Sequence, residues 1–239
     1  MNICGRLCII ALLFQTCTSD KENKATALKP FNDFLDSYYE GRLKFFPLEA
    51  TQIGDNRYNN LLPNDISETF RPELNDFYSR YKSELMNYHR DSLSSQEQVS
   101  YDIFKREMDV NLKTLTFKDH YIPVQQFWGM TLTMPQIGSG KSYQPFKSVK
   151  DYENFLQRID AFAIWMDTAV VNMRKGLSVG YTYPKILMER VLPQAKDMIV
   201  ADIKESIFWG PIQDMPDGIS REDSTRLKKS YEEAIKNKI

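Results

Sequence analysis

Apolar residues recur at intervals of three or four positions along most of the chain, and this spacing restricts the fold more than any other feature. It is the period of an amphipathic helix, which buries one stripe of side chains. The longest stripe follows Ser148, a residue suited to cap a helix, and ends at Gly176, a residue suited to stop one. Its members are Val149, Tyr152, Phe155, Leu156, Ile159, Phe162, Ala163, Met166, Ala169, Val170 and Met173. We therefore predict a long helix there, with these side chains in the core.

Other segments share this period and predict further helices. They begin at Phe31, Phe70, Ser95, Pro184 and Arg221. Gln98 stands three residues after Ser95 and completes the pattern of a capping box. Pro47 stops the first of these helices, and Pro193 should kink the one that starts at Pro184. Together the segments predict an all-α fold, an irregular multi-helix bundle.

Residues 117–147 break the helical pattern. They mix proline, glycine, aromatic and β-branched residues without a period, and so long a connection inside a compact domain is usually functional. We predict a long strand-like loop or hairpin, with strands near residues 121–124 and 130–134. Because an isolated ribbon is marginal, it should lean on the helices through Phe127 and Trp128. Such a strand is also suited to pair with the backbone of a bound peptide.

The first 17 residues, MNICGRLCIIALLFQTC, have the pattern of an export signal. Arg6 precedes an uncharged apolar run that is too short to span a bilayer. The run ends at Cys17, which is typical of a bacterial lipoprotein signal whose cysteine is acylated; the alternative is an ordinary signal peptide cut nearby. Residues 18–27 are polar and predict a flexible tether. We therefore expect a protein of the cell envelope, lipid-anchored to the outer membrane and facing the periplasm or the surface.

Composition excludes several classes of function. All the cysteines, Cys4, Cys8 and Cys17, lie in the signal segment, so no disulfide is expected in the exported chain. The 31 basic and 32 acidic residues leave no basic surplus for nucleic acid. Gly140-Lys141-Ser142 resembles the end of a phosphate-binding loop, but Pro135 stands where that motif needs glycine. Nucleotide binding is therefore not expected either.

Arrangements of residues that carry catalysis are also missing from the sequence. The two histidines, His89 and His120, do not form an H-E-x-x-H pattern and are expected to be solvated or capping residues. No cysteine remains to act as a nucleophile after export, and there is no G-x-S-x-G elbow. We therefore assign no catalytic residue and no metal ligand to this chain.

Three stretches, taken together, resemble a known family. They are FPLEATQIGDNRYN at residues 46–59 with LPNDIS at 62–67, FLQRI at 155–159, and MRKGLSVGYTYP at 173–184. In this order they resemble the bacterial proteins grouped as domain of unknown function 885. Full members of that family resemble helical zinc metallopeptidases and carry an H-E-x-x-P-G-H-H type motif in their second half. That motif is absent here, so the resemblance implies that residues 28–239 are the helical N-terminal part, with zinc expected only in the missing half.

The turn-rich opening of this resemblance contains candidate substrate-cleft residues. Asp55, Arg57 and Asn59 either line a cleft wall that orients a peptide substrate or serve only to shape the turns. Arg174 is a fourth candidate, and its alternative role is to match the dipole at the end of its helix.

Two functions remain open from the sequence. The first is the N-terminal helical wall of a lipid-anchored zinc-dependent peptidase, without catalytic residues of its own. The second is a stand-alone helical lipoprotein that binds a peptide or protein partner. Apolar residues off the main stripe of the longest helix, Ile164 and Trp165, predict a surface that the missing half would cover.

Overall fold

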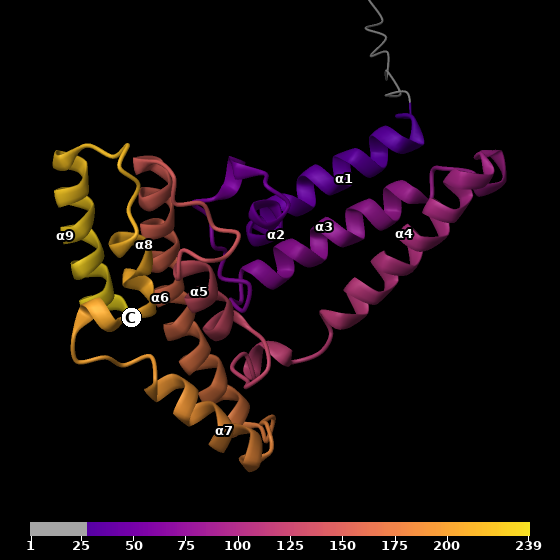
Figure 1. Cartoon of the computed structure of the whole chain (residues 1–239). Helices are drawn as coiled ribbons and strands as arrows, with labels where there is room; N and C mark the ends of the chain where they lie inside the picture. Colours follow the sequence, from indigo (N-terminus) through magenta and orange to yellow (C-terminus); the bar gives the residue numbers. More distant parts are fainter. Residues whose placement is uncertain (1–27) are drawn as a thin grey trace, which may run out of the picture.

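The computed structural model describes residues 28–239, which are all-α, as predicted, and contain no strand (Figure 1). The helices form two groups with separate hydrophobic cores. One group is an arm of three helices near the start of the chain, and the other is a body built around one long helix. Within the described residues, no helix is long and apolar enough to cross a membrane.

The arm consists of α1 (Phe31–Phe45), α3 (Phe70–Leu85) and α4 (Ser95–Thr114), which lie side by side in Figure 1. Its core is rich in aromatic rings that meet edge to face; the Tyr38 and Phe104 centroids, for example, are 4.8 Å apart. The helices α1 and α3 approach closely at Gly41, where an added Cβ would stand 2.8 Å from the Phe77 ring. The short helix α2 (Pro47–Gln52) and the 3₁₀ turn η1 (Asn56–Tyr58) then lead away from α1.

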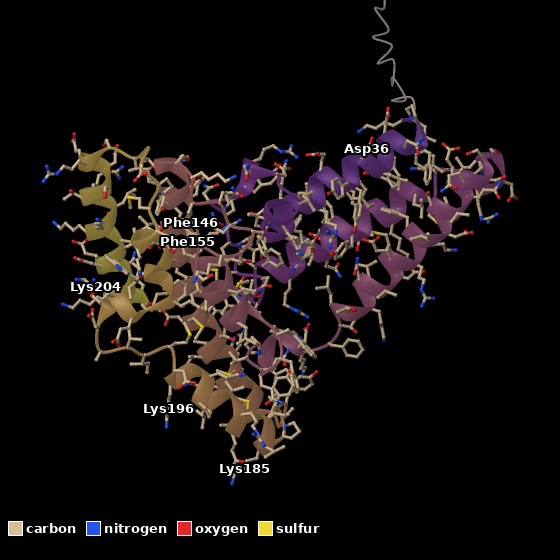
Figure 2. The ribbon with its side chains drawn as sticks, viewed as in Figure 1. Asp36, Phe146, Phe155, Lys185, Lys196 and Lys204 are labelled. Carbon is tan, nitrogen blue, oxygen red and sulfur yellow. The ribbon has the colours of Figure 1, made fainter. Side chains whose placement is uncertain are left out.

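The body surrounds α6 (Val149–Ser178), the long helix predicted from its stripe. The other helices of the body are α5 (Met130–Gly138), α7 (Lys185–Lys196), α8 (Gly210–Gln213) and α9 (Arg221–Lys238). Phe146 and Phe155, labelled in Figure 2, meet in its core with ring centroids 5.2 Å apart. The Tyr231 hydroxyl of α9 donates to the Tyr152 carbonyl of α6 at 3.1 Å, which ties the last helix to the long one.

Single-turn 3₁₀ segments make most of the remaining connections. They are η2 (Arg90–Ser92), η3 (Asp119–Tyr121), η4 (Ile203–Glu205) and η5 (Ile207–Trp209).

The helix ends follow the predicted capping chemistry with small shifts. Ser148 caps α6 and forms a capping box with Asp151. The box that opens α4 is formed by Ser94 and Glu97, one residue earlier on each side than predicted, because Glu97 is the side chain that reaches back to the Ser94 N–H. The long helix continues to Ser178, two residues beyond the predicted stop, and the turn after it is made by Gly180 with φ of 71°.

The prediction of a strand-like hairpin in residues 117–147 is wrong. The segment contains η3, an irregular loop and α5, and its Phe127 and Trp128 side chains are 68% and 70% exposed rather than packed on helices. Met134 and Ile137 of α5 are fully buried, and Gly138 lies against the rings of Phe155 and Phe208. A helix satisfies its own backbone groups, whereas a lone ribbon would have left an unpaired edge, so burial against the body overrode strand propensity.

The prediction that Trp165 faces away from the core is also wrong. Trp165 is 3% exposed, while its neighbour Ile164 is 61% exposed. The long helix buries a second face because residues 59–68, which lead from η1 to α3, pack along it. The apolar stripe in the sequence identifies one buried face of a helix. It did not show that a loop also buries the face that contains Trp165.

Candidate functional site

Residues 57–68, the turn-rich connection between α2 and α3, run along one face of α6 and are hydrogen-bonded to it. Trp165 Nε1 donates to Asp65 Oδ1 at 2.7 Å, and Asn172 Nδ2 donates to the Ile66 carbonyl at 2.8 Å. Asn64 Nδ2 donates to Thr168 Oγ1 at 2.7 Å. The long helix therefore fixes the path of this connection by side-chain bonds rather than by apolar packing alone.

Arg158 of α6 forms several hydrogen bonds of this kind. It is fully buried, and its guanidinium donates to the Leu61 carbonyl at 3.1 Å and the Tyr58 carbonyl at 3.1 Å. It also donates to Thr51 Oγ1 at 2.8 Å and to Gln144 Oε1. These acceptors are all uncharged, and burial lowers the pKa of Arg158 to about 10. Residues 47–61, with their turns, thus surround the buried cation of Arg158.

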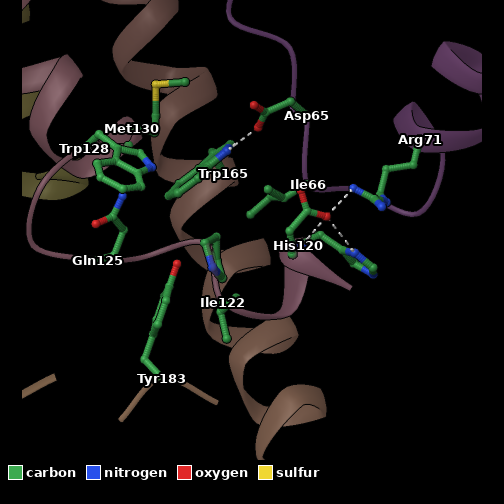
Figure 3. A pocket seen from close by; sticks show the side chains of 13 residues that line it. Asp65, Ile66, Arg71, His120, Ile122, Gln125, Trp128, Met130, Trp165 and Tyr183 are labelled. Atoms are coloured by element: carbon green, nitrogen blue, oxygen red, sulfur yellow. Dashed lines mark hydrogen bonds and ion pairs between the residues drawn. The ribbon is translucent and has the colours of Figure 1, made fainter. Parts of the chain in front are cut away.

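The connection places Asp65 and Ile66 on the wall of a pocket of about 320 Å³ where the arm meets the body (Figure 3). In that view Asp65, Ile66 and His120 stand on one side, Gln125 and Trp128 on the other, and Tyr183 below. The remaining lining residues are Arg71, Asp119, Ile122, Pro123, Gly129, Met130 and Trp165. A pocket of this size lies at the lower end of the range for small-ligand sites.

Asp65 is the carboxylate of the pocket that is not paired with a cation. Its Oδ1 accepts from Trp165 Nε1, and the side chain forms no salt bridge among the described residues. The residue is accessible to solvent although protein atoms crowd its carboxyl group, because it stands on the wall of a hollow. Burial raises the pKa of Asp65, an effect that the bond from Trp165 only partly opposes.

The opposite charges of the pocket neutralise each other at its rim. Arg71 donates to Asp119 Oδ1 at 3.0 Å and to the carbonyls of Leu115 and Phe117 at 3.0 and 2.8 Å. His120 lies beside this pair, with its Nδ1 3.9 Å from Asp119 Oδ1, and Nδ1 has no hydrogen-bond partner in residues 28–239. Burial, followed by the positive charge of Arg71, lowers the pKa of His120. His120 is therefore a neutral imidazole near pH 7.

The loop before α5 supplies the far wall. Gln125 is 7% exposed; its Oε1 accepts from the Phe127 N–H at 3.0 Å, while its Nε2 has no partner among the described residues. Gly129 takes a φ of 116°, which a side chain would resist, and allows the loop to turn directly into α5. This turn leaves the Trp128 indole at the pocket with most of its surface free.

A second, apolar pocket of about 180 Å³ adjoins the first and shares Ile122 and Tyr183 with it. Its other lining residues are Tyr121, Val124, Met173, Leu177, Tyr181, Thr182 and Met188. The two pockets together offer polar groups on one side of a common wall and an apolar surface on the other.

The four predicted cleft residues lie elsewhere and do not line either pocket. Asp55 and Arg57 form an exposed ion cluster with Glu40, in which Arg57 Nη2 and Asp55 Oδ2 are 2.6 Å apart. Asn59 is buried and donates to Asn56 Oδ1 at 2.8 Å. Arg174 is exposed near the end of α6. Contact of these residues with a substrate stays a prediction. Cys17, the predicted lipidation site, lies outside the described residues.

The pocket combines polar groups with aromatic surface and, within the described residues, has no arrangement of metal ligands. Across residues 28–239, no group of three or more histidine, cysteine, aspartate or glutamate side chains is placed to hold a metal ion. Apart from the Arg71–Asp119 ion pair, the polar groups of the pocket are a carboxylate, a neutral imidazole, an amide and a phenol, surrounded by aromatic rings. Sequence reasoning missed Asp65, Trp165 and the clamp Arg158. The available signal was the seven-residue spacing of Arg158, Trp165 and Asn172, which places them on one helix face.

Comparisons with known proteins agree with this fold. The family model described as bacterial protein of unknown function (DUF885) matches residues 47–239. A solved structure, titled as that of "a putative lipoprotein of unknown function" from Shewanella oneidensis, superposes with a TM-score of 0.64 at 15% sequence identity. The superposition covers 87% of this chain but 36% of that one. No curated protein matches the sequence. Because the family model spans most of its length, this chain belongs to the DUF885 family of bacterial proteins.

Proposed function

We propose that this chain is the N-terminal helical wall of a lipid-anchored, zinc-dependent peptidase of the cell envelope, and that it contributes substrate contacts but no catalytic residue. The family membership supports this assignment, and so does the fold shared with a longer chain described as a lipoprotein. In this proposal zinc and the reacting groups belong to a second half with the H-E-x-x-P-G-H-H type motif.

The pocket between the arm and the body is the observation that carries the proposal. It is open and combines free hydrogen-bonding groups with exposed aromatic surface, which are the features that a peptide backbone and its side chains require. The neighbouring apolar pocket lies across the shared wall of Ile122 and Tyr183, close enough to receive the next side chain of the same peptide. Peptide contact therefore belongs to this half of the protein.

The catalytic part of the proposal is tested with purified protein, zinc and a fluorogenic peptide library. The 239-residue chain should retain no stoichiometric zinc after dialysis, because a catalytic zinc site needs about three convergent protein ligands. It should also hydrolyse none of the peptides. Zinc-dependent hydrolysis that disappears when His89 and His120 are both replaced would contradict the assignment.

The anchor is tested separately by metabolic labelling with a fatty acid. In the proposal Cys17 is acylated and holds the protein at the outer membrane, so the wild type should label and sediment with membranes. The Cys17→Ser variant should lose the label and appear as a soluble or uncleaved form. Equal labelling of both proteins would reject lipidation at this residue.

The alternative function, a stand-alone lipoprotein that binds a peptide or protein partner, uses the same pocket without any peptidase half. The reading frame after the codon for Ile239 distinguishes the two. An H-E-x-x-P-G-H-H motif encoded in the same frame supports the peptidase wall. A frame that stops at once, together with peptide binding by the chain, supports the alternative.

A further inference from the structure

We propose that the pocket around Asp65 recognises a primary ammonium group, the free N-terminus of a peptide, and holds it between the Asp65 carboxylate and the aromatic rings of Trp128 and Tyr183. This inference rests on the proposed function, since it names the chemical class of peptide that the pocket accepts. Three features of the described residues carry it: a carboxylate without a counter-charge, an exposed indole on the opposite side of the pocket, and the absence of an available cation in the wall.

The first feature is the position of Asp65. Its Oδ1 is held by Trp165 Nε1 at 2.7 Å, so the carboxyl group cannot turn away from the pocket without losing this bond. The second oxygen, Oδ2, accepts no hydrogen bond from another of the described residues. An ammonium group has three N–H donors and needs acceptors of this kind. A charged hydrogen bond to Oδ2 would supply the missing counter-charge in a partly desolvated place, where such bonds are strong.

The second feature is the aromatic surface opposite Asp65. The Trp128 indole is exposed at the pocket and Tyr183 closes it from below (Figure 3). The faces of aromatic rings attract cations, and tryptophan does so best. A ligand that covers the exposed indole removes apolar surface from water, which favours binding. The ring and the carboxylate therefore favour the same kind of ligand.

The third feature excludes an anion as the ligand. Arg71, the cation nearest the site, is already bound to Asp119 and to two backbone carbonyls, so it has little capacity left for a carboxylate or phosphate. His120 is neutral near pH 7 and brings no positive charge. An anion would instead meet the charges of Asp65 and Asp119. The electrostatic balance of the wall thus selects a cation.

The adjoining pocket indicates which residue follows the ammonium group. Met173, Leu177 and Met188 form an apolar surface directly across the shared wall. A peptide whose first side chain is apolar can place that side chain there while its N-terminus remains at Asp65. We therefore chose as probe the tripeptide amide Leu-Ala-Ala-NH₂, which has a free N-terminus and no carboxylate.

Isothermal titration of the 239-residue chain compares three probes. Leu-Ala-Ala-NH₂ should bind at least tenfold more tightly than its N-acetylated form, which has lost the ammonium charge. N-acetyl-Lys-Ala-Ala-NH₂ carries the same ammonium group on a side chain and separates the two sources. Weaker binding of this third probe supports the N-terminus, and equal or tighter binding overturns it in favour of a lysine side chain.

Two variants test the assigned residues. Asp65→Asn should weaken binding of the free tripeptide at least tenfold and leave the acetylated one unaffected, because asparagine keeps an acceptor for Trp165 but has no charge. Trp128→Ala should weaken it severalfold, and since this side chain is exposed the fold should be unchanged. Asp36→Asn is the matched control: Asp36 is an exposed aspartate on α1, labelled in Figure 2 away from the pocket, and its replacement should change nothing.

The results distinguish a failure of ammonium recognition from a failure of peptide binding. Equal binding of free and acetylated tripeptides overturns ammonium recognition but leaves peptide contact in place. Unchanged affinity in a folded Asp65→Asn protein also overturns it. Failure of every probe to bind, at any concentration up to millimolar, overturns the peptide contact itself and therefore the proposed function of the pocket.

Discussion

Arg158 shows at the scale of one residue how a polar side chain can organise a fold. A buried guanidinium is normally paired with a carboxylate, yet Arg158 is surrounded by carbonyls, a hydroxyl and an amide. Each donor is bound to an acceptor on the connection between α2 and α3 or on the loop before α6. These bonds offset the cost of removing the charge from water, and they require the connection to keep its path.

Replacing Arg158 should therefore destabilise the protein strongly. Arg158→Met has a similar volume but leaves the carbonyls of Tyr58 and Leu61 and the Gln144 amide without donors in a buried place. We expect a loss of roughly 3 kcal/mol or more in the free energy of unfolding, since each buried unpaired group costs about 1–3 kcal/mol. Urea unfolding measures the loss. Arg174→Met, at an exposed arginine of the same helix, is the control and should stay within about 0.5 kcal/mol.

His120 should make stability depend on pH. Its pKa in the folded protein lies below the 6.5 of an unperturbed histidine because of burial and the nearby Arg71 charge. Between these two pKa values the unfolded chain binds a proton that the folded chain does not, so the free energy of unfolding decreases as pH falls through 6.5. The loss is complete below the folded pKa.

The His120→Gln variant should lose less stability than the wild type between pH 7.5 and pH 5.5, in urea unfolding at both values. Comparing the change with pH, rather than the stability itself, cancels any packing cost of the substitution. An identical decrease in both proteins would show that His120 does not titrate as its surroundings indicate.

At the scale of elements, the end of α6 depends on one close approach. An added Cβ at Gly176 would stand 2.6 Å from the Tyr181 carbonyl oxygen and 2.9 Å from that of Tyr121 in η3. Both atoms belong to the backbone and cannot rotate aside. Gly176 therefore lets η3, which carries His120 into the pocket, pack directly on the long helix.

Gly176→Ala should cost about 1–3 kcal/mol of unfolding free energy, which is typical of overpacking in a rigid place. Gly218→Ala is the matched control, because nothing lies within 4 Å of its added Cβ. The control should be neutral or slightly stabilising. Thermal unfolding of the two variants beside the wild type gives the comparison, and equal midpoints for both variants would contradict the close-approach argument.

At the scale of the whole molecule, hydrogen bonds link two groups of helices that have separate cores. The arm has its own aromatic core and the body has another. Arg158, Trp165 and Asn172 of the body bind the connection between α2 and α3 and so attach the arm. The pocket lies at this joint. A site between two separately packed units is a common position for ligand binding.

The surface near α7 predicts association of the chain. Leu177 and Val179 at the end of α6 and Ile186 and Leu192 on α7 are all exposed. We expect the wild type to bind a hydrophobic dye and to self-associate in sedimentation experiments, because exposed apolar patches promote both. Leu177→Gln with Ile186→Gln should reduce dye binding.

The control for this prediction is a double substitution on the arm. Val99→Gln with Ile103→Gln replaces two exposed apolar residues of α4 and should reduce dye binding less. A monomeric wild-type chain that binds no dye would contradict the prediction and favour the stand-alone lipoprotein.

The sequence by itself determined the longer helices. Apolar spacing, prolines and capping serines act within a few residues of each other, so α1, α3, α6 and α9 are readable from local pattern. Residues 46–59, which resemble the family in sequence, belong to the turn region that Arg158 of the long helix binds through hydrogen bonds.

Tertiary structure alone decided the pocket and the form of residues 117–147. Asp65 lies more than 50 residues before His120 and Trp128 in the sequence. They meet because Arg158 and Trp165 hold the connection on α6 and Gly176 allows η3 to pack against it. Met130–Gly138 became a helix because its buried face fits the body, a preference that depends on neighbours more than on local propensity. Contacts between distant residues depend on the packed chain as a whole, which is why local pattern could not reveal them.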